Sequence, residues 1–267
     1  MRFQLQIHCL ILSVLFCPVC KAQEMQQSET ESESVESSNM VGIVVQNSPR
    51  YWGSKERYNQ LLPLVQFRHQ AFFIDTQKGV GYDLLAHNGM YLEHSLGYDL
   101  GRADKNSTWR DGSNKLKGLS AIKTNANTSV AFGWQFRPWL IPEIKVTMPL
   151  TQSQGSQFQA SVTVVPLQTK QNTIILQGTL LGADSRYINT YYGVSAQQSM
   201  KSGFPQFHSS GGLVGSKFNI NWIHQFNTDW GMFTGITYLR LANKVIASPI
   251  IEQHNQFMTN WGITYNF

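Results

Sequence analysis

The feature that most constrains this chain is a two-residue alternation of apolar and polar side chains, which recurs along residues 40–267. Successive side chains of a β-strand point to opposite faces, so this period predicts strands with one apolar and one polar face. The clearest case lies at 90–100, where one face carries Met90, Leu92, Leu96, Tyr98 and Leu100. No long stretch repeats apolar residues at the three-to-four spacing of a helix. The sequence therefore predicts an all-β domain.

Twelve strands are predicted, and the weaker ones could merge to leave ten. They lie at 40–48, 61–74, 79–86, 90–102, 127–137, 141–150, 157–167, 172–182, 187–194, 212–226, 230–242 and 256–267. Such strands fit a β-sandwich, whose apolar faces pack inward. They also fit a transmembrane antiparallel β-barrel, whose apolar face meets lipid while the other face lines a polar lumen.

Strand length and the placement of aromatic residues favour the transmembrane barrel over the sandwich. Many predicted strands are about ten residues long, which is the length that a tilted strand needs to cross a bilayer. Aromatic residues gather near the predicted strand ends, where interfacial girdles form in membrane proteins. These residues are Tyr51, Trp52, Trp134, Trp139, Trp222, Trp230, Tyr238 and Trp261.

The last predicted strand, 256–267, ends the chain on Phe267, with large apolar residues alternating with small or polar ones. A soluble protein seldom leaves such an edge at a terminus, because the edge invites pairing with other chains. In a closed barrel the last strand pairs with the first, and no edge remains. The pattern resembles the C-terminal signal of bacterial outer-membrane barrels, which implies recognition by the barrel assembly machinery through the strand ending at Phe267.

Two segments precede the predicted barrel domain of residues 40–267. Residues 1–22 combine Arg2, a short apolar stretch and small residues up to Ala22, which is the pattern of a secretory signal peptide. Residues 23–39 are acidic and polar, which predicts a disordered tether because too little apolar surface is present for burial. All three cysteines lie in the predicted signal, so the mature chain is expected to have no disulfide, no thiolate metal site and no cysteine nucleophile.

The predicted barrel domain is more basic than the whole chain. When the two bases of the signal and the five acids of the tether are set aside, 19 basic and 11 acidic residues remain, a net charge of +8. The bases are scattered and the chain is predicted to be exported, so nucleic acid is not an expected partner. Contact with outer-membrane lipid or another anionic envelope component fits this charge better.

An even strand count places both ends of the domain in the periplasm, and the loops then follow by alternation. The tight turn Asn227-Thr228-Asp229 is predicted to be periplasmic, and the longer segments 195–211 and 243–256 are predicted to face outward. Long outer loops and short periplasmic turns are the asymmetry expected of such barrels. The long segment 104–125 fits this scheme awkwardly.

A set of short motifs carries a family resemblance over about residues 40–267. The motifs are Tyr51-Trp52-Gly53-Ser54, Gly101-Arg102, Leu116-Lys117-Gly118-Leu119, Tyr187-Ile188-Asn189-Thr190-Tyr191-Tyr192-Gly193-Val194-Ser195, Ser210-Gly211-Gly212-Leu213 and Ser248-Pro249-Ile250. Their order and spacing resemble the OmpV family, also called the MltA-interacting protein (MipA) family. The resemblance implies an outer-membrane barrel. In the family's namesake the barrel is a scaffold that joins a lytic murein transglycosylase to a bifunctional murein polymerase, and the family supplies no catalytic residues.

The residues give little support to an enzyme. The sequence has no Gly-x-Ser-x-Gly elbow, and the nearest local pairing of a base with a nucleophile is His208-Ser209-Ser210 in a predicted loop. His94 and His224 fall on apolar faces, where a position near the membrane interface would suit them. No spacing of histidines and acids predicts a metal site. We therefore expect no catalytic residues, no metal and no cofactor.

Charged residues on predicted inward faces leave two functions open. Arg68, Glu93, Asp99, Arg102 and Arg137 are predicted to face the lumen, either as a constriction that selects a solute or as an ion-pair network that fills a small barrel. The first function is a non-enzymatic scaffold that links murein-synthesising and murein-degrading enzymes to the outer membrane. The alternative is a narrow channel for small polar solutes.

Overall fold

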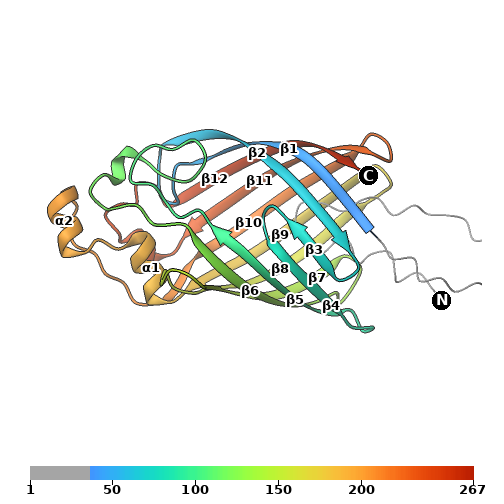
Figure 1. The fold of residues 1–267 in the computed structure, drawn as a ribbon, viewed down its shortest axis with the longest axis horizontal. Coiled ribbons are helices and arrows are strands. Elements are labelled where there is room, and N and C mark those ends of the chain that lie inside the picture. Colours follow the sequence, from blue (N-terminus) through green and yellow to red (C-terminus); the bar gives the residue numbers. More distant parts are fainter. Residues whose placement is uncertain (1–36) are drawn as a thin grey trace, which may run out of the picture.

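The computed structural model describes residues 37–267, which form a closed barrel of twelve antiparallel strands with the order β1-β12-β11-β10-β9-β8-β7-β6-β5-β4-β3-β2 (Figure 1). The strands are β1 (Ser37–Pro49), β2 (Arg57–His69), β3 (Phe72–Asp75), β4 (Gly79–Leu85), β5 (Met90–Asp99), β6 (Asn125–Trp134), β7 (Leu140–Pro149), β8 (Gln157–Gln168), β9 (Asn172–Ala183), β10 (Gly212–Gln225), β11 (Trp230–Leu241) and β12 (Asn255–Asn266). β12 pairs with β1, as the terminal alternation predicts, and Val45 lies across from Trp261 in that pair. The predicted signal peptide and nearly all of the predicted tether lie outside the described residues.

Apolar side chains cover the outer face of the barrel and polar ones line most of the inside. On β1, Ile43 and Val45 point outward and are about half exposed, whereas Val44 between them is buried. The same alternation gives outward Ile144, Val162 and Leu180 on β7, β8 and β9. An apolar outer band with a polar interior is the arrangement of a transmembrane barrel. The predicted barrel is therefore confirmed, and the sandwich is wrong.

The two ends of the barrel differ. Both termini of the described chain lie at one end, where short turns join the strands, and we call this the turn end (Figure 1). At the opposite end, the loop end, long connections carry α1 (Ser185–Tyr192), α2 (Ala196–Ser202), α3 (Asn243–Ile246) and the short 3-10 helix η2 (Asn114–Leu116). The segment 100–124, between β5 and β6, belongs to this loop end. The long segment predicted at 104–125 is therefore consistent with long loops at one end of the barrel and short turns at the other. Within residues 37–267, no helix is both long and apolar enough to cross a membrane.

Aromatic rings form a girdle at the turn end. Phe67 meets Phe267 edge to face at 6.0 Å between ring centroids, and Trp230 packs on Tyr265 at 5.0 Å. His224 lies between Trp222 and Phe226 in this region. Two of the predicted girdle residues, Tyr51 and Trp52, lie among the loops and not in a girdle. Tyr51 is buried among the loops, and Trp52 packs against a loop-end cluster of apolar side chains, because both follow β1 where the chain turns inward.

The strand predicted at 187–194 is wrong, since these residues belong mainly to the helix α1. The Asp184 side chain caps its N-terminus by accepting the Tyr187 N–H at 2.7 Å. Ile188 and Tyr192, four residues apart, are the buried residues of the helix. The β-branched and aromatic composition of this segment favours a strand, but the cap and the helical spacing of its apolar face outweigh that preference.

The single strand predicted at 61–74 is also wrong, because the chain turns at 70–71 between β2 and β3. His69 lies across from Phe72, so the turn is only two residues long. Gln70 takes the left-handed backbone conformation (φ 55°), which is uncommon for residues other than glycine. The turn lacks the Gly, Asn, Asp or Pro that usually marks one in a sequence. The twelve-strand count is correct only because this extra strand replaces the one lost to α1.

Candidate functional site

An apolar plug crosses the lumen toward the turn end. It consists of inward side chains that are all at least nine-tenths buried, namely Met40, Val44, Leu64, Val165, Ile175, Ile223 and Phe233, with Leu62 packed against them. They come from β1, β2, β8, β9, β10 and β11, and β2 and β8 stand on opposite sides of the strand ring. Apolar residues inside a membrane barrel cannot be explained by lipid contact. They instead close the passage through the barrel at this level.

The part of the lumen nearer β3 and β4 is filled by a different group. Phe73 is buried, and Arg68 and Lys78 both lie over its ring at less than 6 Å. Arg68 forms an ion pair with Asp83, and both side chains are largely buried. This pair and the aromatic ring complete the closure on the side that the apolar plug leaves open.

A polar cavity of about 460 Å³ lies between this plug and the loop end. Leu62 and Leu64 of the plug line it, and so does Trp52, which also packs against the loop-end cluster. Most of its other lining residues carry amide or hydroxyl groups, and they include Gln46, Gln66, Gln159, Ser161, Thr163, Gln177, Thr179, Asn219, Asn221, Thr237 and Asn260. Such a lining can hydrogen-bond water or a polar solute.

Six charged residues also line this cavity: Asp75, Glu93, Glu143, Lys78, Lys145 and Lys217. Each of the three acids has a donor. Glu93 accepts the Lys78 ammonium at 2.5 Å, and Glu143 accepts the Tyr91 hydroxyl at 2.6 Å. Asp75 accepts the backbone N–H groups of residues 77 and 78 at 2.6 and 3.0 Å.

Lys145 and Lys217 differ from these groups. Among the described residues, neither ammonium has an ion-pair or hydrogen-bond partner. Both lysines occupy inward positions of strands whose alternation the sequence predicts, at 141–150 and 212–226. The alternation in the sequence could therefore have identified both lysines as inward-facing. That they line the same cavity depends on how the strands close into a barrel.

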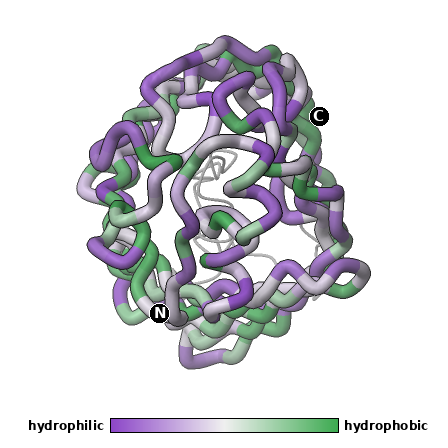
Figure 2. The backbone as a smooth tube through the Cα atoms, turned by 90° about the vertical axis from the view of Figure 1, so that its left-hand side faces the viewer, coloured by the Kyte–Doolittle hydropathy of each residue, from purple (hydrophilic) through white to green (hydrophobic). Residues whose placement is uncertain are grey.

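At the loop end, the motifs of the family resemblance meet in packed loops, and Figure 2 shows loop segments across the mouth of the barrel. Tyr51, Leu116, Leu119, Val194 and Ile250 form one buried cluster. A second cluster joins Ile188, Tyr192 and Val245 to side chains at the ends of β9, β10 and β11. Seen from the loop end, segments of the loops lie across the mouth of the barrel. Motifs that are up to two hundred residues apart in the sequence thus build one packed unit, which we call the loop cap.

Polar contacts link the segments of the loop cap. The Tyr51 hydroxyl donates to the Ile250 carbonyl at 2.8 Å, and the Ser248 hydroxyl donates to the Tyr192 carbonyl at 2.5 Å. Arg102 is buried, and its guanidinium donates to the Tyr191 carbonyl. These bonds satisfy backbone carbonyls that would otherwise be buried without a partner. The resemblance therefore rests on residues that hold the loops together.

One carboxyl group in the loop cap is strongly perturbed. Asp111, which lies within the segment 100–124, accepts the Tyr58 hydroxyl at 3.2 Å. Burial raises the pKa of Asp111 to about 6, although the bond from Tyr58 and the charge of Arg102 both favour its ionised form. The loop cap therefore contains a group that titrates close to neutral pH.

The predicted inward charges do not form one constriction. Arg68 pairs with Asp83 near the turn end, and Glu93 lines the central cavity. Asp99 accepts the Tyr191 hydroxyl at 3.0 Å in the loop cap, where Arg102 also lies. Arg137 is exposed in the turn between β6 and β7 and stacks on Phe136, so its predicted lumenal position is wrong. The chain leaves β6 before this residue, which ends the alternation.

None of the histidines in residues 37–267 is hydrogen-bonded to a serine. His208 is exposed, and among the hydrogen bonds of residues 37–267 none joins it to a serine. His94 and His224 point outward, and their ring nitrogens contact Thr128 Oγ1 and Asn172 Oδ1, both at 2.9 Å. Side-chain partners of this kind make the histidines tolerable on the outer face. Within the same part of the chain, no group of three or more His, Cys, Asp or Glu residues is arranged to hold a metal ion.

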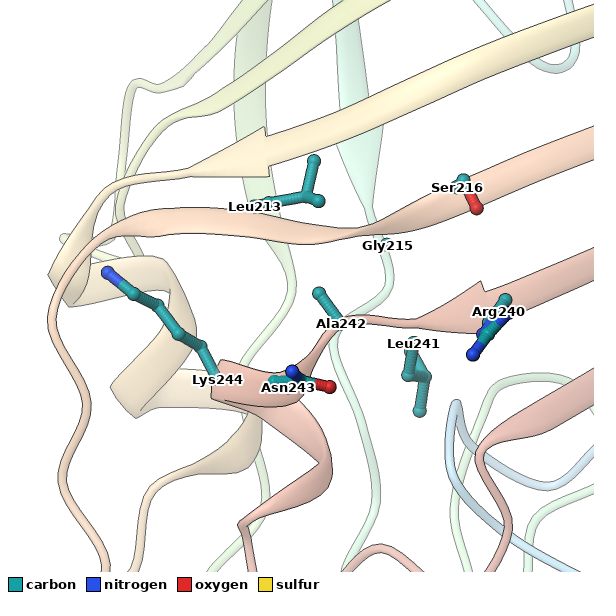
Figure 3. A pocket seen from close by; sticks show the side chains of 8 residues that line it. All are labelled: Leu213, Gly215, Ser216, Arg240, Leu241, Ala242, Asn243 and Lys244. Atoms are coloured by element: carbon teal, nitrogen blue, oxygen red, sulfur yellow. The ribbon is translucent and has the colours of Figure 1, made fainter.

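A second hollow lies at the loop end of β10 and β11, beside α3 (Figure 3). It has a volume of about 480 Å³, and its two basic residues are Arg240 and Lys244. Their side chains point apart, and the Lys244 ammonium already donates to the Ser210 hydroxyl and the Gly211 carbonyl. This hollow therefore does not bring charges together, in contrast to the lumenal cavity.

Comparisons with solved structures return barrels of low similarity. The NanC porin has a TM-score of 0.48 and 10% identity, covering 84% of this chain and 100% of its own. The CymD monoaromatic hydrocarbon channel has a TM-score of 0.43 and 7% identity, covering 86% and 88%. The COG4313 outer membrane channel from Pseudomonas putida F1 has a TM-score of 0.39 and 8% identity, covering 91% and 100%. No curated protein matches the chain.

The family comparison is decisive, because it covers nearly all of the described barrel. The family model of the MltA-interacting protein MipA matches residues 41–267. This range contains every motif of the resemblance, together with the cavity, the loop cap and all of the plug except Met40. The chain belongs to the MipA family of outer-membrane β-barrel proteins.

Proposed function

We propose that this protein is a non-enzymatic scaffold, which links murein-synthesising and murein-degrading enzymes to the outer membrane. The observation that carries this proposal is the closed lumen. The apolar plug leaves Phe233 with no exposed surface, and the packed loops of the loop cap lie across the other end. A barrel closed in this way serves as a membrane anchor with surfaces for other proteins, rather than as a pore.

The partners are proposed from the family name, which describes a protein that interacts with the murein transglycosylase MltA. The partner-facing surface would be the turn end, since both termini lie there and such barrels keep their termini in the periplasm. The turns at this end are short, so a partner would meet a shallow rim of exposed polar residues such as Lys170 and Asp229. We further propose that the acidic tether predicted at 23–39 extends this surface up to the start of β1 at Ser37, and that a signal peptide at 1–22 directs export. We also propose that the barrel assembly machinery recognises the strand that ends at Phe267 and inserts the protein into the outer membrane.

Site-specific crosslinking from the two ends tests the scaffold. A photo-reactive residue at position 170 reports on partners of the turn end, and one at position 200 reports on the loop end. Met200 on α2 is 82% exposed, so the control position is also accessible. We expect a murein transglycosylase or polymerase, identified by mass spectrometry, to crosslink to position 170 and not to position 200. Failure to recover either enzyme from position 170, or equal recovery from both, would contradict the scaffold.

The polar cavity favours a second candidate, a narrow channel for small polar solutes. Its amide and hydroxyl lining suits a hydrated solute, and the loop cap or the plug would have to move for passage. Conductance of the purified protein in planar bilayers separates the two functions. Stable unitary openings would refute a pure scaffold, whereas a silent bilayer with correctly folded protein would remove the channel.

A further inference from the structure

The lumenal cavity contains two cations that form no direct ion pair or hydrogen bond within the described part of the chain, although three acids line the same cavity. Lys145 on β7 and Lys217 on β10 both line it, and their ammonium groups lack an ion-pair or hydrogen-bond partner within residues 37–267. A charged group taken out of bulk water is costly unless it is paired or solvated. Two such groups facing one polar space therefore need water or an anion there.

The acids of the same cavity do not meet this need. Glu93 is held by Lys78, Glu143 by the Tyr91 hydroxyl, and Asp75 by two backbone N–H groups. The formal charges of the cavity balance, but the hydrogen bonds do not. Each acid already accepts at least one hydrogen bond, whereas the ammonium groups of Lys145 and Lys217 donate none within the described residues.

Uncharged donors surround the two lysines in a regular pattern. Lys217 on β10 lies across from Thr179 on β9, and Thr179 lies across from Ser161 on β8. On the neighbouring row, Lys145 lies across from Gln159. All of these residues line the cavity. The strands between the lysines thus present two hydroxyl groups and an amide to the space that the two ammonium groups share.

Thr179 gives an independent indication of a missing ligand. Its side chain is 95% buried, and its Oγ1 is without a hydrogen-bond partner in the described structure. Buried hydroxyl groups are nearly always bonded, so an orphaned one beside a cation calls for a partner atom. A hydroxyl can donate to the same oxygen that accepts from an ammonium, and this arrangement suits an oxyanion.

We propose that the lumenal cavity is a binding site for a small oxyanion, a carboxylate or a phosphate. Lys145 and Lys217 hold the charged group, and Thr179, Ser161 and Gln159 donate to its oxygens. Lysine binds such groups as a point charge, and bonds to charged groups are about twice as strong as neutral ones. Asn219 and Gln177 also line the cavity, and the Asn219 amide donates to the Gln177 side-chain carbonyl at 3.1 Å.

The site is independent of the proposed scaffold and of channel activity. A ligand would enter the cavity past the loop cap, and the plug at the turn end need not open. Loss of binding in a variant would leave the crosslinking to murein enzymes unchanged. A silent planar bilayer would likewise not count against the site.

Calorimetric titration of the purified mature protein in detergent tests the proposal. The probes are inorganic phosphate, glucose 6-phosphate and gluconate, with glucose as the neutral counterpart. We expect the anionic probes to bind and glucose not to bind. Lys217→Gln and Lys145→Gln should each weaken the affinity at least tenfold, which corresponds to about 1.4 kcal/mol. Lys170→Gln, in an exposed turn far from the cavity, should bind as the native protein does.

Two further readouts separate a binding role from a structural one. Removal of an unpaired cation should leave the stability of the ligand-free barrel unchanged or raise it, whereas a structural lysine would destabilise the barrel when replaced. Thr179→Val keeps the volume and removes the hydroxyl, so it should weaken binding several-fold without unfolding the protein. The proposal is overturned if no anionic probe binds, if glucose binds equally well, or if the cavity variants bind as Lys170→Gln does.

Discussion

Phe233 is the residue on which closure of the lumen depends most, and its replacement by alanine tests that closure. Along β11 the next inward positions on either side are Gly231 and Gly235, and the residue across the strand pair is Gly262. A β-carbon on Gly262 would lie 2.3 Å from the Phe233 ring, so the ring occupies the space above this glycine. Only Ile223 on β10 contributes a large neighbour across the other pair.

The size of the effect follows from these neighbours. Phe233 has no exposed surface, and replacing a buried phenylalanine by alanine costs about 3–5 kcal/mol of unfolding free energy. The cost depends on how far the surroundings can collapse into the hole. Three adjacent glycines have no side chains that could move in, so we expect a loss near the upper value, about 4–5 kcal/mol. The hole would also join the cavity to the turn end through the weakest part of the plug.

Urea unfolding in lipid vesicles measures the stability, and planar-bilayer recordings measure the passage. The matched control is Phe218→Ala, because Phe218 lies on the lipid-facing side of β10 and is 43% exposed. We expect Phe233→Ala to lose clearly more stability than the control and to show openings that the native protein lacks. A loss of less than about 1 kcal/mol, or one equal to that of Phe218→Ala, would refute the plug. The plug would also be refuted if the native protein conducted as readily as Phe233→Ala.

Gly133→Ala should lower the unfolding free energy by about 1–3 kcal/mol, because the added β-carbon would lie 2.2 Å from the Tyr91 ring. In a Tyr91→Ala background the same change should be neutral or stabilising. Urea unfolding of this double-mutant cycle measures the coupling, and additive effects would contradict the contact between Gly133 and Tyr91. Because burial raises the pKa of Asp111 to about 6, the folded protein binds a proton that the unfolded chain releases between about pH 4 and 6. The unfolding free energy should therefore fall by at most about 3 kcal/mol as the pH rises through that window. If the unfolding free energy of Asp111→Asn depends on pH in the same way, Asp111 is not the source of the dependence. Asp184→Ala should lower the unfolding free energy by about 1–2 kcal/mol, because it removes the N-cap of α1. The amide of Tyr187 should then exchange its hydrogen faster, and an unchanged exchange rate would argue against the cap.

The wall of the barrel could be predicted largely from local pattern. The side-chain period of a strand is two, so the alternation at 212–226 and 256–267 specifies both the strand and the face that meets lipid. The strand predictions were wrong where the local sequence pattern and the tertiary packing favour different structures. The segment 185–192 has strand-forming residues but is capped by Asp184 and buries one helical face, and the turn after His69 has no turn residue to announce it.

The sequence by itself determined the fold class, the lipid-facing surface and the closing partner of the terminal strand, because these follow from a period read along one strand. Only the tertiary structure decided what fills the barrel. Phe233, Lys145 and Lys217 all occupy inward positions of regular strands, yet one closes the lumen and two face an open cavity. The same holds for the loop cap, where Tyr51 bonds to Ile250 across almost the whole chain. Such contacts depend on how a ring of twelve strands closes, and no period within one strand contains that information.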